Sequence, residues 1–269
     1  KSINYYEDIY NESNSPVKII HHYEDGVEVA KCTRGQTSFN YFTNNNSTWG
    51  GSGLSSASGS YGLNPDGTST VLYDFEFTGN NATITKYNGD SQNVKIPKRL
   101  CGYKITAIGE SAFRNTNISS VEIPEGVISI GQWAFLNCSK LVSINIPTTV
   151  TFIDFGAFNG CSVLKKVYIE DIETWNEVTF DDETASPLYY NATLYLNNEE
   201  LTNLVFPEGT TVINSIAWRN CDTYISVTFP TSLISVPENA FTGCDTLSYV
   251  FYLGSEEDWA DVSVSDTTI

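Results

Sequence analysis

The chain has 269 residues and a formal net charge of −18, and 41% of its residues are hydrophobic. That hydrophobic share is enough to build a folded core. The negative charge disfavours nucleic acid and anionic lipid as partners, because both carry dense phosphate. No run of about 18 apolar residues is present, so we expect no transmembrane helix and no membrane insertion. The chain contains no Met, which predicts a segment of a longer protein.

The first 66 residues differ from the rest, because they show no internal repeat. We interpret residues 1–66 as an N-terminal β-rich and linker region without an assigned role. Within it, residues 17–30 predict a β-hairpin with Asp25-Gly26 at its turn, a dipeptide that hairpin turns favour. Residues 39–62 are rich in Asn, Ser and Gly, which is typical of a linker or a long loop.

A second hairpin is predicted over residues 71–87, with Gly79-Asn80 near its turn. Repeated sequence begins directly after it. The first unit of a repeat array needs a cover, since an exposed apolar end invites aggregation. We therefore expect residues 71–96 to form a β-type N-terminal cap on the array.

From about residue 93 onward the same anchors return at a fixed interval. Pro124 and Pro147 are 23 positions apart, and so are Cys138 and Cys161. A longer period lies over the short one, because Cys138 and Cys221 are 83 positions apart. A period of 23 residues is in the range of leucine-rich repeats. We infer that a pair of units plus an insert has been duplicated.

One coil of a solenoid explains each anchor of the unit. A short strand ends at Pro147, because proline cannot donate to the next position of a ladder. Ala157-Phe158 sits on a tight helical turn that directs the ring into the core, and Cys161 closes the coil as a small buried apolar group. Equivalent strands of successive coils stack about 4.8 Å apart. The inward positions are Leu141, Ile144 and Ile146 on one wall and Val150 and Ile153 on the opposite wall.

The repeats resemble the BspA-like subclass of leucine-rich repeats. A repeat of that subclass begins with I-P, continues with V-x-x-I-G and ends with A-F-x-x-C. The corresponding segments of this chain are IPEGVISIGQWAFLNC at 123–138 and IPTTVTFIDFGAFNGC at 146–161. The resemblance implies a leucine-rich-repeat solenoid, an α/β-class fold that is rich in β-strand and has short helical turns. The fourth unit departs from the pattern, with Trp218 in place of the Phe and Asn214 in place of the Gly.

The resemblance also implies a domain organisation. Residues 67–269 are assigned to a BspA-like leucine-rich-repeat domain. Its coils are expected over about 93–169 and 203–252, with an insert at 170–202. A second copy of the insert, 253–269, is truncated, so we expect the natural protein to continue.

Each copy of the insert predicts one helical turn. Asp171 or Ser255 can cap that turn, which would place Trp175 or Trp259 inward. Ser255 and Asp258 have the spacing of a capping box, which favours a helix start at this point.

Six Cys are present, and four of them hold one repeat position: Cys138, Cys161, Cys221 and Cys244. Packing explains these four, so we expect buried, reduced and slowly reacting thiols. They are not spaced as C-x-x-C, which disfavours a zinc site. Cys32 and Cys101 lie outside the ladder. Separate free thiols are the favoured interpretation for these two, and a disulfide between them is the alternative.

No pattern in the chain indicates a catalytic site or a metal site, and we expect no cofactor. The pair His21-His22 would point to opposite faces of a strand, so the two cannot readily chelate one metal ion. Acidic clusters at 181–183 and 256–258 lack the pattern of a calcium loop, and we interpret them as solvated surface. Paired carboxylates for glycoside hydrolysis stay an alternative, although no feature of the sequence selects a pair.

The resemblance implies a cell-surface protein that binds host proteins or other bacteria. We therefore predict a non-enzymatic extracellular binding or adhesion module, on a bacterial cell surface or secreted, that acts through protein–protein interaction. The expected partner is a host matrix protein or another cell surface, and a glycan is the alternative. Two other functions stay open: a carbohydrate-binding or substrate-presenting module of a larger secreted enzyme, and a structural spacer.

The outward positions of the predicted strands form the candidate contact surface. Tyr168, Tyr249 and Phe251 are aromatic at such positions, and aromatic side chains are enriched at binding hot spots. Lys166 and Asn145 hold neighbouring outward positions. These five residues are the candidate partner-binding site. The competing interpretation is that the insert simply covers the aromatic side chains.

Overall fold

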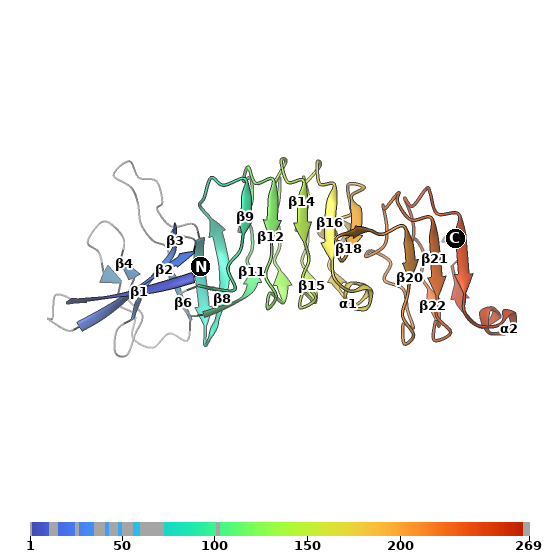
Figure 1. Ribbon diagram of the computed structural model, residues 1–269, viewed down its shortest axis with the longest axis horizontal. Helices are drawn as coiled ribbons and strands as arrows, with labels where there is room; N and C mark the ends of the chain where they lie inside the picture. The colour runs from blue at the N-terminus through green and yellow to red at the C-terminus, as the bar shows by residue number, and fades with distance from the viewer. Residues whose placement is uncertain are drawn as a thin grey trace.

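The computed structural model describes residues 73–100 and 103–265 and, nearer the N-terminus, the backbone of six strands (Figure 1). These strands are β1 (Ser2–Tyr10), β2 (Pro16–Glu24), β3 (Val27–Arg34), β4 (Tyr41–Phe42), β5 (Thr48–Trp49) and β6 (Ser56–Gly59). Strands β1, β2 and β3 form an antiparallel sheet, and β4 pairs with β5. Glu24 of β2 pairs with Val27 of β3, which confirms the hairpin predicted around Asp25-Gly26.

The second predicted hairpin is also confirmed. Strands β7 (Tyr73–Thr78) and β8 (Asn81–Tyr87) pair antiparallel, and Thr78 lies opposite Asn81. Gly79 in the two-residue turn has a φ of +60°, which glycine adopts without steric cost. Strand β6 pairs with the outer side of β7. The hairpin thus caps the solenoid by extending one of its walls.

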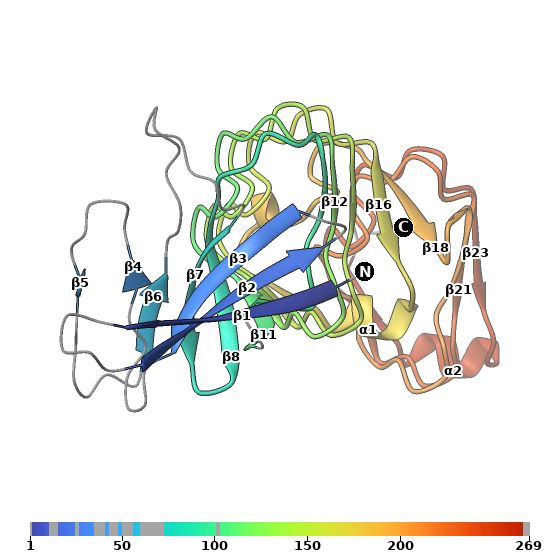
Figure 2. The same cartoon turned by 60° about the vertical axis from the view of Figure 1, so that its left-hand side comes forward.

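Two sheets of parallel strands form opposite walls of the solenoid (Figures 1 and 2). The front sheet contains β9 (Asn93–Lys95), β12 (Ser120–Glu122), β14 (Ser143–Asn145), β16 (Lys166–Ile169) and β18 (Thr193–Leu196), and β19 (Glu199–Glu200) pairs antiparallel with β18. The back sheet contains β8, β11 (Tyr103–Ile108), β13 (Ser129–Ile130), β15 (Phe152–Ile153) and β17 (Thr179–Phe180), and β10 (Arg99–Leu100) pairs antiparallel with β11. The leucine-rich-repeat solenoid expected from the sequence is confirmed.

Strand alternation decides which side chains enter the core. Ser143 pairs with Ser120 on one side and with Lys166 on the other, so equivalent residues of successive coils form rows. The central residues of these strands, such as Ile144 and Val167, are fully buried between the walls. Their neighbours point outward, because successive side chains of a strand face opposite sides.

The segment 170–202, expected as an insert, contributes one strand to each wall. Strand β17 continues the back sheet beside β15, and β18 continues the front sheet beside β16. Thr193 pairs with Lys166, which is 27 positions earlier instead of 23. The longer coil also contains helix α1 (Ile172–Asn176) and the 3-10 helix η1 (Glu183–Ala185). This segment therefore lies within the array as one longer coil.

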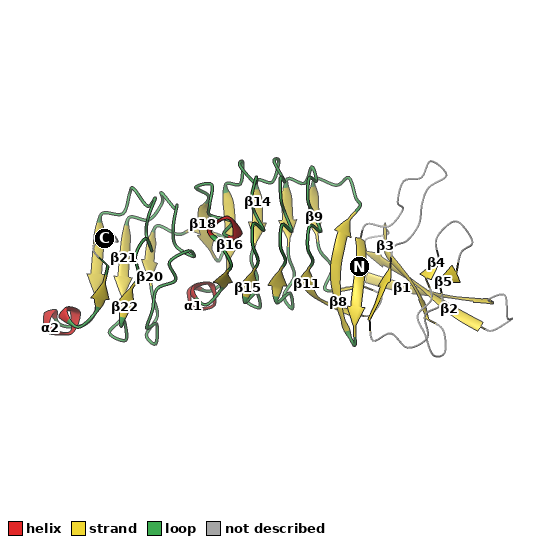
Figure 3. Cartoon of the chain, turned by 180° about the vertical axis from the view of Figure 1, so that it is seen from behind, coloured by secondary structure: helices red, strands yellow, loops and turns green. Residues whose placement is uncertain are grey.

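A second array follows the longer coil. Its second front sheet contains β20 (Asn203–Val205), β21 (Ser226–Phe229) and β23 (Tyr249–Tyr252), and its second back sheet contains β22 (Ser235–Val236) and β24 (Ser263–Val264). Helix α2 (Glu256–Ala260) holds the place of α1. Both front sheets lie on the same side of the solenoid (Figure 2). Figure 3 shows how little of the described chain is helical.

Aromatic rings stack through the core from coil to coil. Phe113, Phe135 and Phe158 lie with ring centroids 5.0 and 5.3 Å apart, and all three are fully buried. Tyr87 of the cap continues the stack 5.2 Å from Phe113. One ring per coil is thus covered by the rings before and after it.

The four Cys of the ladder are buried with free thiols, as expected. Three of them do more than fill space, because their sulfurs donate hydrogen bonds to the preceding coil. Cys138 donates to the carbonyl of Phe113 (3.0 Å), Cys161 to Phe135 (3.2 Å) and Cys244 to Trp218 (3.2 Å). The thiol therefore ties adjacent coils together, which an alanine of similar burial would not do.

The two departures in the fourth unit are explained by one residue of the longer coil. The Asn176 side chain accepts hydrogen bonds from the Trp218 indole N–H (2.8 Å) and from the Asn214 backbone N–H (2.9 Å). It also donates to the carbonyl of Val212 (2.9 Å). Trp218 and Asn214 replace Phe and Gly at the point where this coil meets the longer one.

The predicted helix caps are confirmed. The Asp171 carboxylate accepts from the Thr174 N–H, and Ser255 and Asp258 form a complete capping box. Trp175 is buried and donates its indole N–H to the Ala217 carbonyl (2.9 Å). Trp259 is only partly buried and packs against Tyr252, with ring centroids 5.1 Å apart.

Candidate functional site on the front sheets

The outer face of the front sheet contains a groove of about 560 Å³. It runs across the ends of β9, β12, β14 and β16 and reaches the turn between β18 and β19. The residues that line it with polar side chains are Asn93, Lys95, Ser120, Glu122, Ser143, Asn145, Tyr168, Glu170, Asn197 and Asn198. Tyr168 and Asn145, two of the predicted contact residues, lie on adjacent strands of this groove.

Several groove side chains bind each other and hold the strands in register. The Ser120 hydroxyl donates to the side-chain oxygen of Asn93 (2.7 Å), and the Lys95 ammonium pairs with the Glu122 carboxylate at 2.5 Å. The Asn145 amide accepts from the N–H of Ile123 (2.6 Å) and donates to the carbonyl of the same residue (2.8 Å). Asn145 is thus a clamp between β14 and the end of β12.

The longer coil lies beside the predicted aromatic contact residue of the front sheet and does not cover it. Tyr168 pairs in register with Tyr195 of β18, and their ring centroids are 5.0 Å apart. The Lys166 ammonium lies 5.5 Å from the centre of the Tyr195 ring, within the range of a cation–π interaction. Tyr168 is half-buried and Lys166 is exposed.

The second front sheet has a different outer face. Its exposed apolar side chains are Val205 (50%), Tyr249 (59%), Phe251 (52%) and Leu253 (59%). The rings of Tyr249 and Phe251 stack with centroids 6.4 Å apart. We name these four residues the apolar patch.

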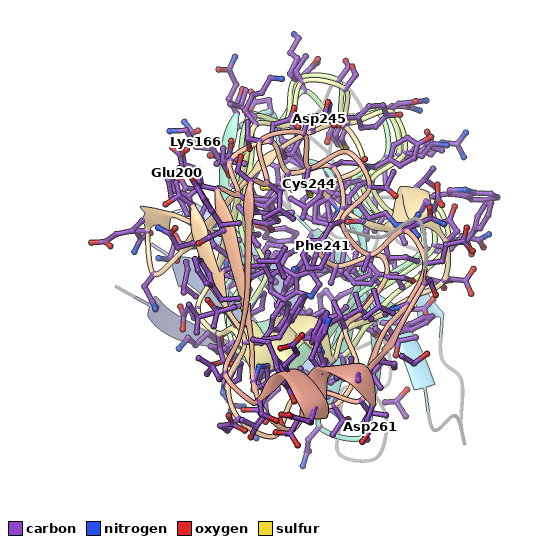
Figure 4. The ribbon with its side chains drawn as sticks, turned by 90° about the vertical axis from the view of Figure 1, so that its right-hand side faces the viewer. Lys166, Glu200, Phe241, Cys244, Asp245 and Asp261 are labelled. Atoms are coloured by element: carbon purple, nitrogen blue, oxygen red, sulfur yellow. The ribbon has the colours of Figure 1, made fainter. Side chains whose placement is uncertain are left out.

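A view along the solenoid separates the inner from the outer side chains. Figure 4 shows Phe241 and Cys244 pointing into the interior, whereas Lys166 and Glu200 lie outside the front sheets. The structure brings Asn145, Lys166 and Tyr168 together on the first sheet. It places the other two predicted contact residues, Tyr249 and Phe251, on the second.

Sequence reasoning missed several residues of these faces. Glu170, Asn197 and Asn198 of the groove lay in the segment expected as an insert. Val205 and Leu253 belong to the apolar patch. The 83-residue period could have found this pair, since Val205 corresponds to Glu122 and Leu253 to Glu170.

The two acidic clusters hold the backbone together. Asp182 accepts a hydrogen bond from the Gly156 N–H (2.9 Å), and Glu183 forms an ion pair with Arg219. Hydrogen bonds from the Ser255 backbone and side chain lower the pKa of Asp258. Asp182 and Glu183 therefore anchor a loop, and Asp258 caps helix α2.

Within residues 73–100 and 103–265, no three His, Cys, Asp or Glu side chains come together as a metal site. The predictions for His21-His22 and for the Cys32–Cys101 pair fall outside the described residues. No helix that the structure describes has the length and apolar character needed to cross a bilayer.

Comparisons with known proteins give a family and several similar structures. A search of curated proteins gave no match. Among solved structures, the chain is similar to a leucine-rich-repeat protein of T. pallidum, with 24% identity over 76% of this chain and 81% of that chain and a TM-score of 0.44. It is similar to one from Bacteroides capillosus, with 33% identity over 46% and 94% and a TM-score of 0.39.

A leucine-rich cell-surface protein from Faecalibacterium prausnitzii is a third similar structure, with 17% identity over 71% of this chain and 96% of that chain and a TM-score of 0.32. The model of the BspA type leucine rich repeat region matches residues 72–188 and 189–257 in six copies. The chain therefore belongs to the family of BspA-type leucine-rich-repeat proteins.

Proposed function

We propose that the protein is a non-enzymatic extracellular binding module that captures a protein partner on the outer faces of its two front sheets. Membership of the family supports the coarser part, because such repeats serve as protein-interaction or surface modules and are typically non-catalytic. The observation that carries the finer part is the apolar patch on the second front sheet.

The apolar patch suits a partner interface for a physical reason. Contiguous exposed apolar side chains on a soluble protein mark interaction sites, since water contact with them is unfavourable. Tyr and Phe bury a large area at low cost in conformational entropy and dominate hot spots. Tyr249 and Phe251 would serve as anchors, with Leu253 next to them on the same strand end and Val205 two strands away, across Thr228.

The groove on the first front sheet would supply the polar part of the same interface. Interfaces combine a dry apolar centre with polar contacts that set orientation. Asn145, Lys166 and Tyr168 lie on this part, and both parts lie on one side of the solenoid (Figure 2). One elongated partner could therefore contact both sheets.

An extracellular location, on a bacterial cell surface or after secretion, fits this proposal. The similar protein from Faecalibacterium prausnitzii is a cell-surface protein. We expect the partner to be a host matrix protein or another cell surface. Strong negative charge favours partners with cationic surface.

A carbohydrate-binding or substrate-presenting module is the second candidate, and the groove favours it. Amide and hydroxyl side chains at Ser143, Asn197 and Asn198 could hydrogen-bond a glycan. That function depends on the polar groups of the groove, whereas the first candidate depends on the apolar patch, so variants of the two faces separate the candidates.

Purified host matrix proteins and a glycan array, both titrated with the chain, test the proposal. For a matrix protein that binds, the double variant Tyr249→Ser with Phe251→Ser should weaken affinity about 30-fold, the equivalent of a 2 kcal/mol hot spot. Phe155→Ser is the control, because Phe155 is an exposed aromatic (43%) that follows a back-sheet strand. Equal losses in both proteins, or binding to glycans alone, would overturn the proposal.

A further inference from the structure

One end of the groove on the first front sheet is satisfied by its own contacts. The Ser120–Asn93 hydrogen bond, the Lys95–Glu122 ion pair and the Asn145 clamp all lie on the side of β9, β12 and β14. Lys95 has the only cationic side chain among the lining residues, and Glu122 neutralises it. These groups hold the sheet together and are already engaged.

The other end, toward β16 and β18, has unsatisfied polar groups. The Tyr168 hydroxyl, the Glu170 carboxylate and the side chains of Asn197 and Asn198 make no hydrogen bond or ion pair with any residue that the structure describes. The Asn197 N–H donates to the Ile169 carbonyl (3.0 Å), which fixes the turn next to Glu170. Both asparagines have left-handed φ values, 51° and 69°, as a two-residue hairpin turn requires.

This end therefore presents one carboxylate, two carboxamides and the ring and hydroxyl of a tyrosine. Its charge is negative and nothing in the groove compensates it. A planar cation with several N–H donors matches these groups, because it can bond a carboxylate and amide oxygens together and stack on an aromatic face. An anionic ligand would meet the Glu170 carboxylate, and the Lys166 ammonium lies over the Tyr195 ring and outside the groove lining.

We infer that this end of the groove binds the guanidinium group of an arginine side chain from an extended partner segment. The inference rests on the proposed function and names the chemistry of the partner at that part of the face. Glu170 would accept the charged hydrogen bonds, Tyr168 would stack against the guanidinium plane, and Asn197 and Asn198 would accept the remaining N–H groups.

The second front sheet offers a comparison within the same molecule. Leu253 holds the place of Glu170, and Phe251 holds the place of Tyr168. That position has an aromatic face but no carboxylate. Arginine recognition is therefore assigned to the first sheet alone.

A titration with small peptides tests this without a known partner. The probe is an acetylated Gly-Arg-Gly amide at low salt, followed by the backbone amide resonances of the full chain. We expect shifts confined to Tyr168, Glu170 and the Asn197-Asn198 turn. The same peptide with citrulline, which is neutral and nearly the same shape, should bind about tenfold more weakly.

Two charge-matched variants complete the test. Glu170→Gln should weaken the arginine peptide about fivefold or more, whereas Glu200→Gln, an exposed carboxylate on the neighbouring strand, should leave it unchanged. Equal effects of the two variants, or equal binding of the citrulline peptide, would overturn the inference. If the arginine peptide does not bind but a protein partner still binds at the apolar patch, this inference fails and the proposed function stands. If the arginine peptide binds but no partner depends on Tyr249 and Phe251, the proposed function fails.

Discussion

The two arrays of coils have nearly the same interior and very different outer faces. Inside, Phe158 and Phe241, or Cys161 and Cys244, hold equivalent buried places 83 residues apart. Outside, the first front sheet is polar, whereas the second exposes large apolar side chains. Four equivalent pairs show the change: Glu122 and Val205, Lys166 and Tyr249, Tyr168 and Phe251, and Glu170 and Leu253.

This difference separates what the fold requires from what it leaves free. An inward residue must fill the space between two walls, so its size and polarity are fixed by its neighbours. An outward residue on the front sheets does not have to fill a space between walls. The divergence of the outer faces is the reason for placing the function there.

The arrays also differ in how well each coil is covered. Val167 of β16 is fully buried, whereas its equivalent Val250 of β23 is 37% exposed. Strand β18 lies beside β16, but no described strand lies on the far side of β23. Since each coil of a solenoid is stabilised by its neighbours, equal substitutions should have unequal effects in the two arrays.

The largest expected effect comes from the aromatic stack. Phe158→Ala should cost about 3–5 kcal/mol of unfolding free energy, because it removes a fully buried ring that stacks on Phe135. Phe241→Ala should cost at least about 1 kcal/mol less, since its site is less tightly covered and can relax. Denaturant unfolding of both variants measures the difference. Equal losses would show that coil coverage does not distinguish the arrays.

A second comparison concerns the amide of α1. Asn176→Ala should cost about 1–3 kcal/mol, because it leaves the buried Trp218 indole N–H without its acceptor. In α2 the residue after the Trp is Ala260, as Asn176 follows Trp175 in α1, and an alanine side chain cannot accept these hydrogen bonds. The paired variant Asn176→Ala with Trp218→Phe should recover part of the loss in a thermal melt. If the single variant is as stable as the parent, the Asn176 hydrogen bonds do not stabilise the protein.

The buried thiols predict a loss of stability at alkaline pH. The pKa of Cys161 is raised mainly by a hydrogen bond with Cys138 and, to a smaller extent, by burial. Burial raises the pKa of Cys244 to about 12. An unfolded thiol ionises near pH 8.5, so the stabilisation is complete below that pH and is lost as pH rises toward the folded pKa. Between pH 8 and pH 10 the Cys244 thiol should account for about 1–2 kcal/mol.

Cys244→Ala should remove the contribution of this thiol to the loss of stability between pH 8 and pH 10. Unfolding free energies measured at these two pH values check the prediction. A variant with the same alkaline slope as the parent would contradict the buried, neutral state of the thiol.

The smallest expected effect is a gain. The hydroxyl of Tyr224 is fully buried without a hydrogen-bond partner in the described part of the chain, and burial raises its pKa well above the usual value. The first array has Leu141 at this place. Tyr224→Phe should therefore stabilise the protein by about 1 kcal/mol, measured as a higher denaturant midpoint. A destabilised variant would mean that the hydroxyl has a partner after all.

The periodic anchors made most of the coil predictable from the sequence. Phe135, Cys138 and their equivalents define one place in the coil, and the structure buries them there. The caps at Asp171 and Ser255 were also predictable, because capping depends on residues only three positions apart. Local and periodic signals suffice for these features.

Other features depend on contacts that the period does not mark. The segment 170–202 has a 27-residue spacing, so it was interpreted as an insert although it builds one coil. The link from Asn176 to Trp218 spans 42 residues and has no local signature. For the candidate site, outward positions were identified, but which of them share a groove depends on how the longer coil joins the sheet. The contact role of Asn145, Lys166, Tyr168, Tyr249 and Phe251 stays a prediction.

Hydroxyl-radical footprinting of the chain with a verified protein partner reads the exposure of individual side chains at the interface. We expect strong protection of Tyr249, Phe251 and Leu253, weaker protection of Tyr168, and no protection of Phe155, which follows a back-sheet strand and is also exposed. Protection of Phe155 with unchanged labelling of Tyr249 and Phe251 would contradict the claim that the protein binds its partner through the outer faces of its front sheets.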